Sequence, residues 1–195
     1  MNIGIYIYND AEVLDFAGPF EVFSVASRFL EESKKLNVFT ISQNDDVINA
    51  RGGFKLNATY NFTNCPKVDV LVVVGGVHTQ EVKKIDVINW IANTSKNTKL
   101  VASVCTGAFL LAQANIITNH DVTTHWEDIK DLQNDYPNLN VISNKRWVDE
   151  GNIVTSGGIS AGIDMSLHLI SKIFDEKLAL KTARQMEFDW TRNKE

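Results

Sequence analysis

The chain has 195 residues, close to the upper end of what a single domain usually holds. Its 44% apolar and 22% charged residues, with only three prolines, exclude a disordered or collagen-like chain and are sufficient for a buried core. The formal net charge of −5, with 19 lysines and arginines scattered along the chain, excludes a basic surface of the kind that binds nucleic acid.

Patterns typical of buried strands recur along the chain, at residues 3–8, 37–41, 68–74, 99–104, 122–124, 141–143 and 153–156. Residues 70–74 and 100–104 are apolar or small throughout, as in parallel strands covered by helices on both faces. Residues 81–93 carry apolar side chains at a near-helical period, which predicts a crossover helix between those strands. Further helices are predicted at 16–29, 160–174 and 175–192, and a short β-excursion at 43–62. These elements predict one α/β sandwich domain over residues 1–195.

The most informative segment is Ser-Val-Cys-Thr-Gly at residues 103–107, between a predicted strand and a helix-forming run. Small, any, nucleophile, any, glycine is the pattern of a nucleophile elbow, with Cys105 as the nucleophile. A helix N-terminus directly after Cys105 would lower the pKa of its thiol. The alternative is a buried structural cysteine in a strand-to-helix turn.

A pair of glycines, Gly75 and Gly76, ends the other strongly apolar strand. Neighbouring parallel strands end at one edge of the sheet, where open α/β folds bind ligands, so this turn is expected near Cys105. The backbone N–H groups of Gly76 and Thr106 are candidates for an oxyanion hole. The alternative is an ordinary tight turn.

An acidic residue, Asp15, immediately precedes the first predicted helix and follows the first strand, so it is expected at the same sheet edge. A carboxyl group near a thiolate has a raised pKa and can serve as a general acid. The alternative is that Asp15 only caps the helix.

Histidine is the usual base for a cysteine, and the chain has four. His125 directly follows a predicted strand and is the best placed. His78 follows the glycine turn and is expected in a solvated loop or at the pocket mouth, whereas structural or surface roles are expected for His120 and His168.

The two cysteines, Cys65 and Cys105, cannot form a disulfide framework, and their spacing matches no zinc-ligand pair. We therefore expect reduced thiols, a cytoplasmic protein and no metal. The first seven residues lack a basic region or cleavage site, and no apolar run approaches the ~18 residues of a membrane helix. We expect neither a signal peptide nor a membrane partner.

Five segments together resemble the ThiJ/PfpI superfamily of class I glutamine amidotransferase-like proteins: residues 15–23, 75–76, 104–108, 123–126 and 155–164. This resemblance implies a flavodoxin-like, doubly wound sandwich with a mostly parallel central sheet, assembled as a homodimer. It is closest to the isonitrile hydratase branch and to the ligand-binding halves of AraC-type regulators. Thr106 follows the cysteine here, where the protease-like branch has histidine, and Asp15 resembles the acid of the hydratase.

The resemblance implies a lyase that uses a cysteine to convert an isonitrile into an N-substituted formamide, without a metal or organic cofactor. Cys105, Asp15 and Thr106 would be its catalytic residues. Gly75, Gly76 and His125 would contribute to the oxyanion and substrate site for a small molecule. The alternatives are a small-molecule-sensing domain, for which we expect no DNA-binding extension in this chain, and a redox-responsive domain with an oxidisable Cys105.

Overall fold

A seven-stranded sheet forms the centre of the computed structural model, which describes residues 1–193. Its strands are β1 (Asn2–Tyr6), β2 (Asn37–Ser42), β5 (Tyr60–Asn61), β6 (Val70–Val73), β7 (Leu100–Val104), β10 (Trp147–Asp149) and β11 (Ile153–Ser156). They are arranged in the order β10-β11-β7-β6-β1-β2-β5. All neighbours are parallel except β10 and β11, which are antiparallel.

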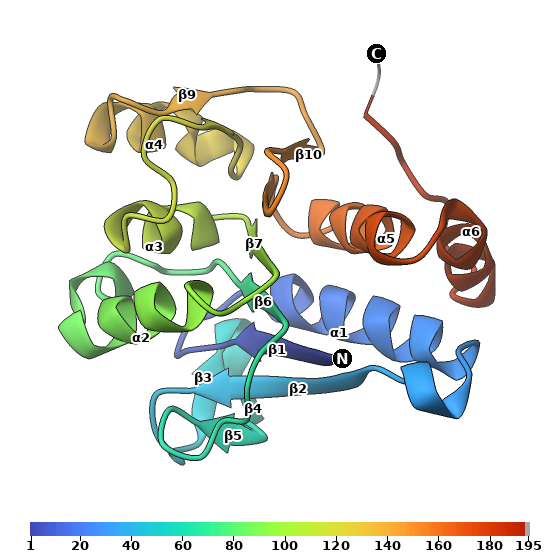
Figure 1. Cartoon of the computed structure of the whole chain (residues 1–195). Coiled ribbons are helices and arrows are strands. Elements are labelled where there is room, and N and C mark those ends of the chain that lie inside the picture. The colour runs from blue at the N-terminus through green and yellow to red at the C-terminus, as the bar shows by residue number, and fades with distance from the viewer. Residues whose placement is uncertain (194–195) are drawn as a thin grey trace.

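Helices cover both faces of the sheet (Figure 1). One face carries α1 (Val13–Arg28), α5 (Ala161–Ile173) and α6 (Glu176–Gln185), and the other carries α2 (Ile85–Ser95) and α3 (Gly107–Gln113). The four residues of β6 and the five of β7 are all buried between these layers. The predicted α/β sandwich with a mostly parallel sheet is therefore confirmed.

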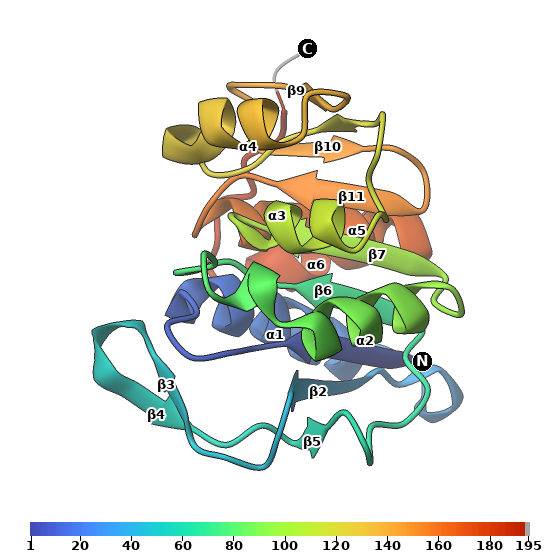
Figure 2. The same cartoon turned by 90° about the vertical axis from the view of Figure 1, so that its left-hand side faces the viewer.

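Smaller elements lie outside the central sheet. Strands β3 (Ile48–Ala50) and β4 (Phe54–Leu56) form an antiparallel hairpin that projects from the body of the domain (Figure 2). Strands β8 (Asp121–Val122) and β9 (Asn140–Val141) pair with each other, with α4 (Ile129–Asp135) between them in the chain. Short 3₁₀ turns occur at Glu32–Lys34, Arg51–Gly53, Glu81–Lys83 and Trp126–Asp128.

Some predicted elements differ from the structure. The segments predicted as strands at 122–124 and 141–143 form only the two-residue pair β8–β9 and add nothing to the central sheet. The last predicted helix, 175–192, ends at Gln185. Strand β10 and helix α4 were not expected from the sequence. Within residues 1–193, no helix combines the length and apolar character needed to span a membrane.

The strand register brings distant segments to one edge of the sheet. Val73 in β6 is paired with Ser103 in β7, and Val104 is paired with Ser156 in β11. The chain leaves each of these strands at nearly the same level, so the turns that follow β6, β7 and β11 lie next to one another. The loop from β1 into α1 joins them through an isolated bridge between Ala11 and Gly76.

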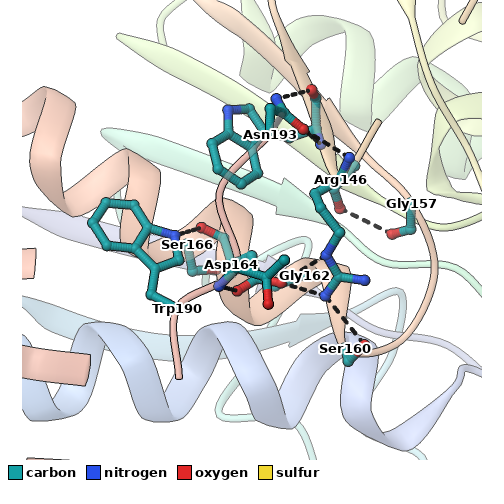
Figure 3. Close-up of polar contacts among 11 residues, drawn as sticks. Arg146, Gly157, Ser160, Gly162, Asp164, Ser166, Trp190 and Asn193 are labelled. Atoms are coloured by element: carbon teal, nitrogen blue, oxygen red, sulfur yellow. Dashed lines mark hydrogen bonds and ion pairs between the residues drawn. The ribbon is translucent and has the colours of Figure 1, made fainter. Parts of the chain in front are cut away.

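A buried ion pair holds the loop before α5 in place (Figure 3). Asp164, fully buried in α5, accepts a hydrogen bond from Arg146 Nε at 2.7 Å and another from the backbone N–H of Thr191 at 2.8 Å. Arg146 also donates to Ser160 Oγ at 3.2 Å. A buried carboxylate requires such partners to offset its lost hydration. The network thereby ties residues near the C-terminus to the loop that enters the candidate site.

Candidate active site

The backbone at Cys105 has the strained conformation that the elbow pattern predicts. Its φ of 55° lies in the left-handed region, which residues other than glycine rarely adopt. The Cys105 N–H donates to the carbonyls of Ser156 and Gly157, each at 3.2 Å, and its own carbonyl accepts from Thr124 Oγ1 at 2.8 Å. These contacts from two other segments hold the turn and direct the side chain away from the sheet.

Two glycines permit the close packing around this turn. A Cβ atom at Gly75 would lie 2.5 Å from the Thr106 nitrogen and 2.7 Å from the Cys105 Cβ. A Cβ atom at Gly107 would overlap the carbonyl oxygen of Val73. Any side chain at either position would therefore push the β6 and β7 turns apart.

Asp15 connects three segments that are distant in the sequence. Its side chain is fully buried, and its two oxygens accept separate backbone hydrogen bonds, from Gly75 N–H at 3.1 Å and from Ile159 N–H at 3.0 Å. Helix α1 begins at Val13, with Glu12 in the capping position. Asp15 therefore lies inside the first turn, and the helix-capping alternative is wrong.

Burial makes Asp15 a much weaker acid than an ordinary aspartate. Loss of hydration raises the pKa of its carboxyl group to about 7, although the N–H groups of Ile159 and Gly75 favour the charged form and oppose the shift. An interaction with the Cys105 thiol also lowers it. Asp15 can therefore both release and accept a proton near neutral pH, as a general acid and base must.

The thiol of Cys105 does not have the lowered pKa expected from its position before a helix. Its pKa is raised well above the usual range, first by burial and second by the negative charge of Asp15, while the N–H of Thr106 opposes the shift. The residue is only 7% exposed. Burial and a nearby carboxylate outweigh the dipole of α3, so the resting group is a thiol.

Thr106 joins the two glycine-rich turns. Its hydroxyl donates to the Gly76 carbonyl and accepts from the Gly76 N–H, both at 2.9 Å. The Gly76 N–H is thus already paired and does not face a reacting oxygen. The Thr106 N–H instead interacts with the sulfur of Cys105.

A cavity of about 620 Å³ opens above the thiol. Its lining comprises Glu12, Arg51, Gly52, Gly76, His78, Cys105, Thr106, His125, Glu127, Asp128 and Ile159. The volume falls within the range usual for small-molecule sites. Of the six expected site residues, four line the cavity, namely Cys105, Thr106, Gly76 and His125. Asp15 and Gly75 do not line it; Asp15 is fully buried and accepts a hydrogen bond from the Gly75 N–H.

Two histidines line the cavity together with Cys105. Gly158 separates the His125 ring from the thiol: a Cβ atom there would overlap the ring and lie 3.2 Å from Cys105 Sγ. The Nδ1 atom of His125 lies 3.3 Å from Asp128 Oδ2. His78 packs on Phe109, with ring centroids 4.1 Å apart, and burial lowers its pKa.

Other groups around the site were not identified from the sequence. Ile159 supplies an N–H to Asp15 from a left-handed conformation, with φ of 56°, that its residue type does not suggest. Arg51, between β3 and β4, lies beside Glu12, and its N–H donates to the adjacent carbonyl of Ala11. His168, outside the site as expected, lies 2.6 Å from an oxygen of Asp149.

Known proteins resemble this chain in sequence and in structure. The profile of the DJ-1/PfpI family matches residues 1–172. An isonitrile hydratase of Pseudomonas putida is 30% identical over 96% of this chain and 78% of its own length. The HTH-type transcriptional regulator GbdR of Pseudomonas aeruginosa is 24% identical over 100% of this chain but only 52% of its own length. A ThiJ/PfpI family protein from Pseudomonas syringae superposes with a TM-score of 0.84 at 22% identity, over 96% of this chain and 75% of that one.

Proposed function

Since the chain belongs to the DJ-1/PfpI family, we propose that it is a cysteine-dependent isonitrile hydratase-like lyase that converts an isonitrile into an N-substituted formamide. The observation that carries the proposal is the pairing of a buried thiol, Cys105, with a buried carboxyl group, Asp15, whose pKa is about 7. The hydratase relative supports the choice of reaction.

The first half of the reaction forms a covalent intermediate. The Asp15 carboxylate takes the thiol proton as Cys105 Sγ bonds to the terminal carbon of the isonitrile. Protonated Asp15 then delivers that proton to the same carbon, which gives a thioimidate with a carbon–nitrogen double bond. This step needs a carboxyl group that exchanges a proton near pH 7, which the raised pKa of Asp15 supports. The raised pKa of Cys105 keeps the proton on the sulfur until the carbon–sulfur bond forms.

The second half consumes water. The oxygen of the water bonds to the thioimidate carbon while Asp15 accepts a proton from that water. Asp15 then delivers the proton to the substrate nitrogen. In this proposal the Thr106 N–H stabilises the negative charge that develops on the oxygen as the hydroxyl of the tetrahedral centre loses its proton; its contact with Cys105 supports that role. The carbon–sulfur bond then breaks, the hydroxyl proton returns to the sulfur, and the formamide leaves.

Two other functions compete with this one. A sensing role gains support from the regulator relatives, of which this chain spans about half the length. A redox role requires a free thiolate that peroxide can oxidise, whereas the hydratase reaction needs the Cys105 proton to leave only as the carbon–sulfur bond forms. The raised pKa of Cys105 therefore weighs more against the redox role.

A panel of small substrates tests the proposal. The purified chain is incubated with cyclohexyl isocyanide, a simple amide and a dicarbonyl, and products are followed by chromatography. We expect N-cyclohexylformamide to form. Conversion of the amide or the dicarbonyl alone would replace the hydratase assignment, and binding of a panel member without conversion would favour the sensing role.

A further inference from the structure

Acidic side chains outnumber basic ones in the lining of the reaction cavity. Three carboxylates, on Glu12, Glu127 and Asp128, face it within the described part of the chain, against one permanent cation, on Arg51. The same cavity is lined by the candidate nucleophile, Cys105.

The single cation is already paired with one of the acids. Arg51 Nη1 lies 3.5 Å from Glu12 Oε2, so their charges largely compensate each other. The remaining carboxylates, Glu127 and Asp128, lie 3.7 Å and 3.3 Å from Nδ1 of His125, and no arginine or lysine shares the cavity lining with them apart from Arg51.

The charge of one of these acids reaches the reacting atom. The negative charge of Asp128 is one of the causes that raise the pKa of the Cys105 thiol. His78 is a second histidine in the lining, besides His125. Burial lowers the pKa of His78 and thereby favours its neutral form. Charged lining groups near the sulfur are thus mainly carboxylates.

Other cations line a neighbouring cavity. A second cavity, of about 1060 Å³, shares His125, Glu127 and Ile159 with the first and is also lined by Lys130, Lys145 and Arg146. The guanidinium of Arg146 is engaged with the buried Asp164. None of these three cations lines the cavity that contains Cys105.

We propose that the reaction cavity selects substrates whose substituent is neutral or positively charged and discriminates against anionic ones. The inference rests on the proposed function for its substrate class, an isonitrile carrying a cationic group such as an ammonium. Two carboxylates at typical cavity distances attract a cation and repel an anion. We therefore expect a roughly tenfold preference for cationic over anionic substrates at low ionic strength, which falls as salt is added.

Thiol modification tests the charge preference without any assumption about turnover. In Cys65→Ser protein, Cys105 is modified with methanethiosulfonates that carry a trimethylammonium, a sulfonate or only a methyl group, and each rate is divided by that of the neutral reagent. This division removes effects of the thiol pKa. We expect the cationic reagent to exceed the anionic one by roughly tenfold.

Cys65 provides an internal reference on the same protein. Its own cavity, of about 540 Å³, is lined by one charged residue, Lys67, and by no acid. In Cys105→Ser protein, the ratio of the cationic to the anionic reagent rate at Cys65 should be several-fold lower than at Cys105. Both thiols lie in a protein of the same net charge, so a difference between the ratios reports the charges near each thiol.

A pair of double variants assigns the effect to particular acids. Glu127→Gln with Asp128→Asn should bring the ratio at Cys105 close to that at Cys65. The control, Glu31→Gln with Glu32→Gln, removes two exposed carboxylates outside the cavity lining and should leave the ratio unchanged. An anionic preference at Cys105, or equal ratios in the two double variants, would overturn the proposal.

Turnover provides the second arm. Isonitriles of equal length bearing a dimethylamino or a carboxylate group are compared by kcat/KM, and the amine is expected to be favoured by a similar factor. If neither isonitrile is converted, the proposed function fails, while the modification ratios still decide whether the cavity is charge-selective.

Discussion

Replacing Cys105 by serine should reduce formamide production from an isonitrile by at least about a thousandfold, because a hydroxyl is a far weaker nucleophile and Asp15 is too weak a base to ionise it. Serine is close in size, so the strained turn held by Ser156, Gly157 and Thr124 should persist. The measurement is the initial rate of formamide release.

The matched control is Cys65→Ser. Cys65 is half-buried, its thiol donates only to the adjacent Pro66 carbonyl, and it lies outside the cavity above Cys105. Its replacement should leave the rate within about twofold. Equal rates in wild type and Cys105→Ser would remove Cys105 from the chemistry.

Replacing Asp15 by asparagine should lower turnover by roughly a hundredfold or more, because general acid–base catalysis typically contributes that much. The amide cannot carry the thiol proton to the substrate carbon. A suitable control is Glu21→Gln in the same helix, since Glu21 is exposed and pairs only with Arg28. Retained turnover in Asp15→Asn would reassign the proton transfer to another group.

The same variant should change how stability depends on pH. The pKa of Asp15 is about 7 when folded and 3.8 when unfolded, so the folded state binds more protons between these values. Its contribution is therefore fully present below about pH 4 and is lost as pH rises through 7, a loss of a few kcal/mol by linkage, about 1.4 kcal/mol per pKa unit.

Urea unfolding at pH 4.5 and 8 measures this contribution. The free energy of unfolding of wild type minus that of Asp15→Asn should fall between the two pH values, because asparagine does not titrate. The sign follows from burial of the carboxyl group, which disfavours its charged form. A difference that stays constant or rises with pH would show that the folded pKa of Asp15 is not raised.

The sheet and the position of the site follow from local sequence patterns. Residues 70–74 and 100–104 are uniformly apolar or small, and such runs form buried parallel strands whose ends share one edge. The Ser-x-Cys-x-Gly pattern predicts the elbow because Gly107 must pass against the Val73 carbonyl. Gly75 lies close to Thr106 because the turns that follow β6 and β7 meet at that same edge of the sheet.

The acidity of the site could not be predicted from those patterns. The pKa of the Cys105 thiol depends on burial and on the charge of Asp15, which come from the packing of segments distant in the sequence. The pairing of Thr106 with Gly76, which occupies an N–H expected to stabilise an oxyanion, likewise depends on how two turns meet. Ile159 gave no signal, because nothing in its residue type indicates a left-handed donor.

The covalent thioimidate on Cys105 is the central claim, and rapid-quench mass spectrometry tests it most directly. Wild-type protein is mixed with a slight excess of an isonitrile labelled with ¹³C at its terminal carbon, quenched in acid and digested. The account predicts that the peptide containing Cys105 gains the mass of one isonitrile and loses it as labelled formamide appears. Formamide released at full rate with no adduct on that peptide at any time, or an adduct on Cys65 instead, would contradict it.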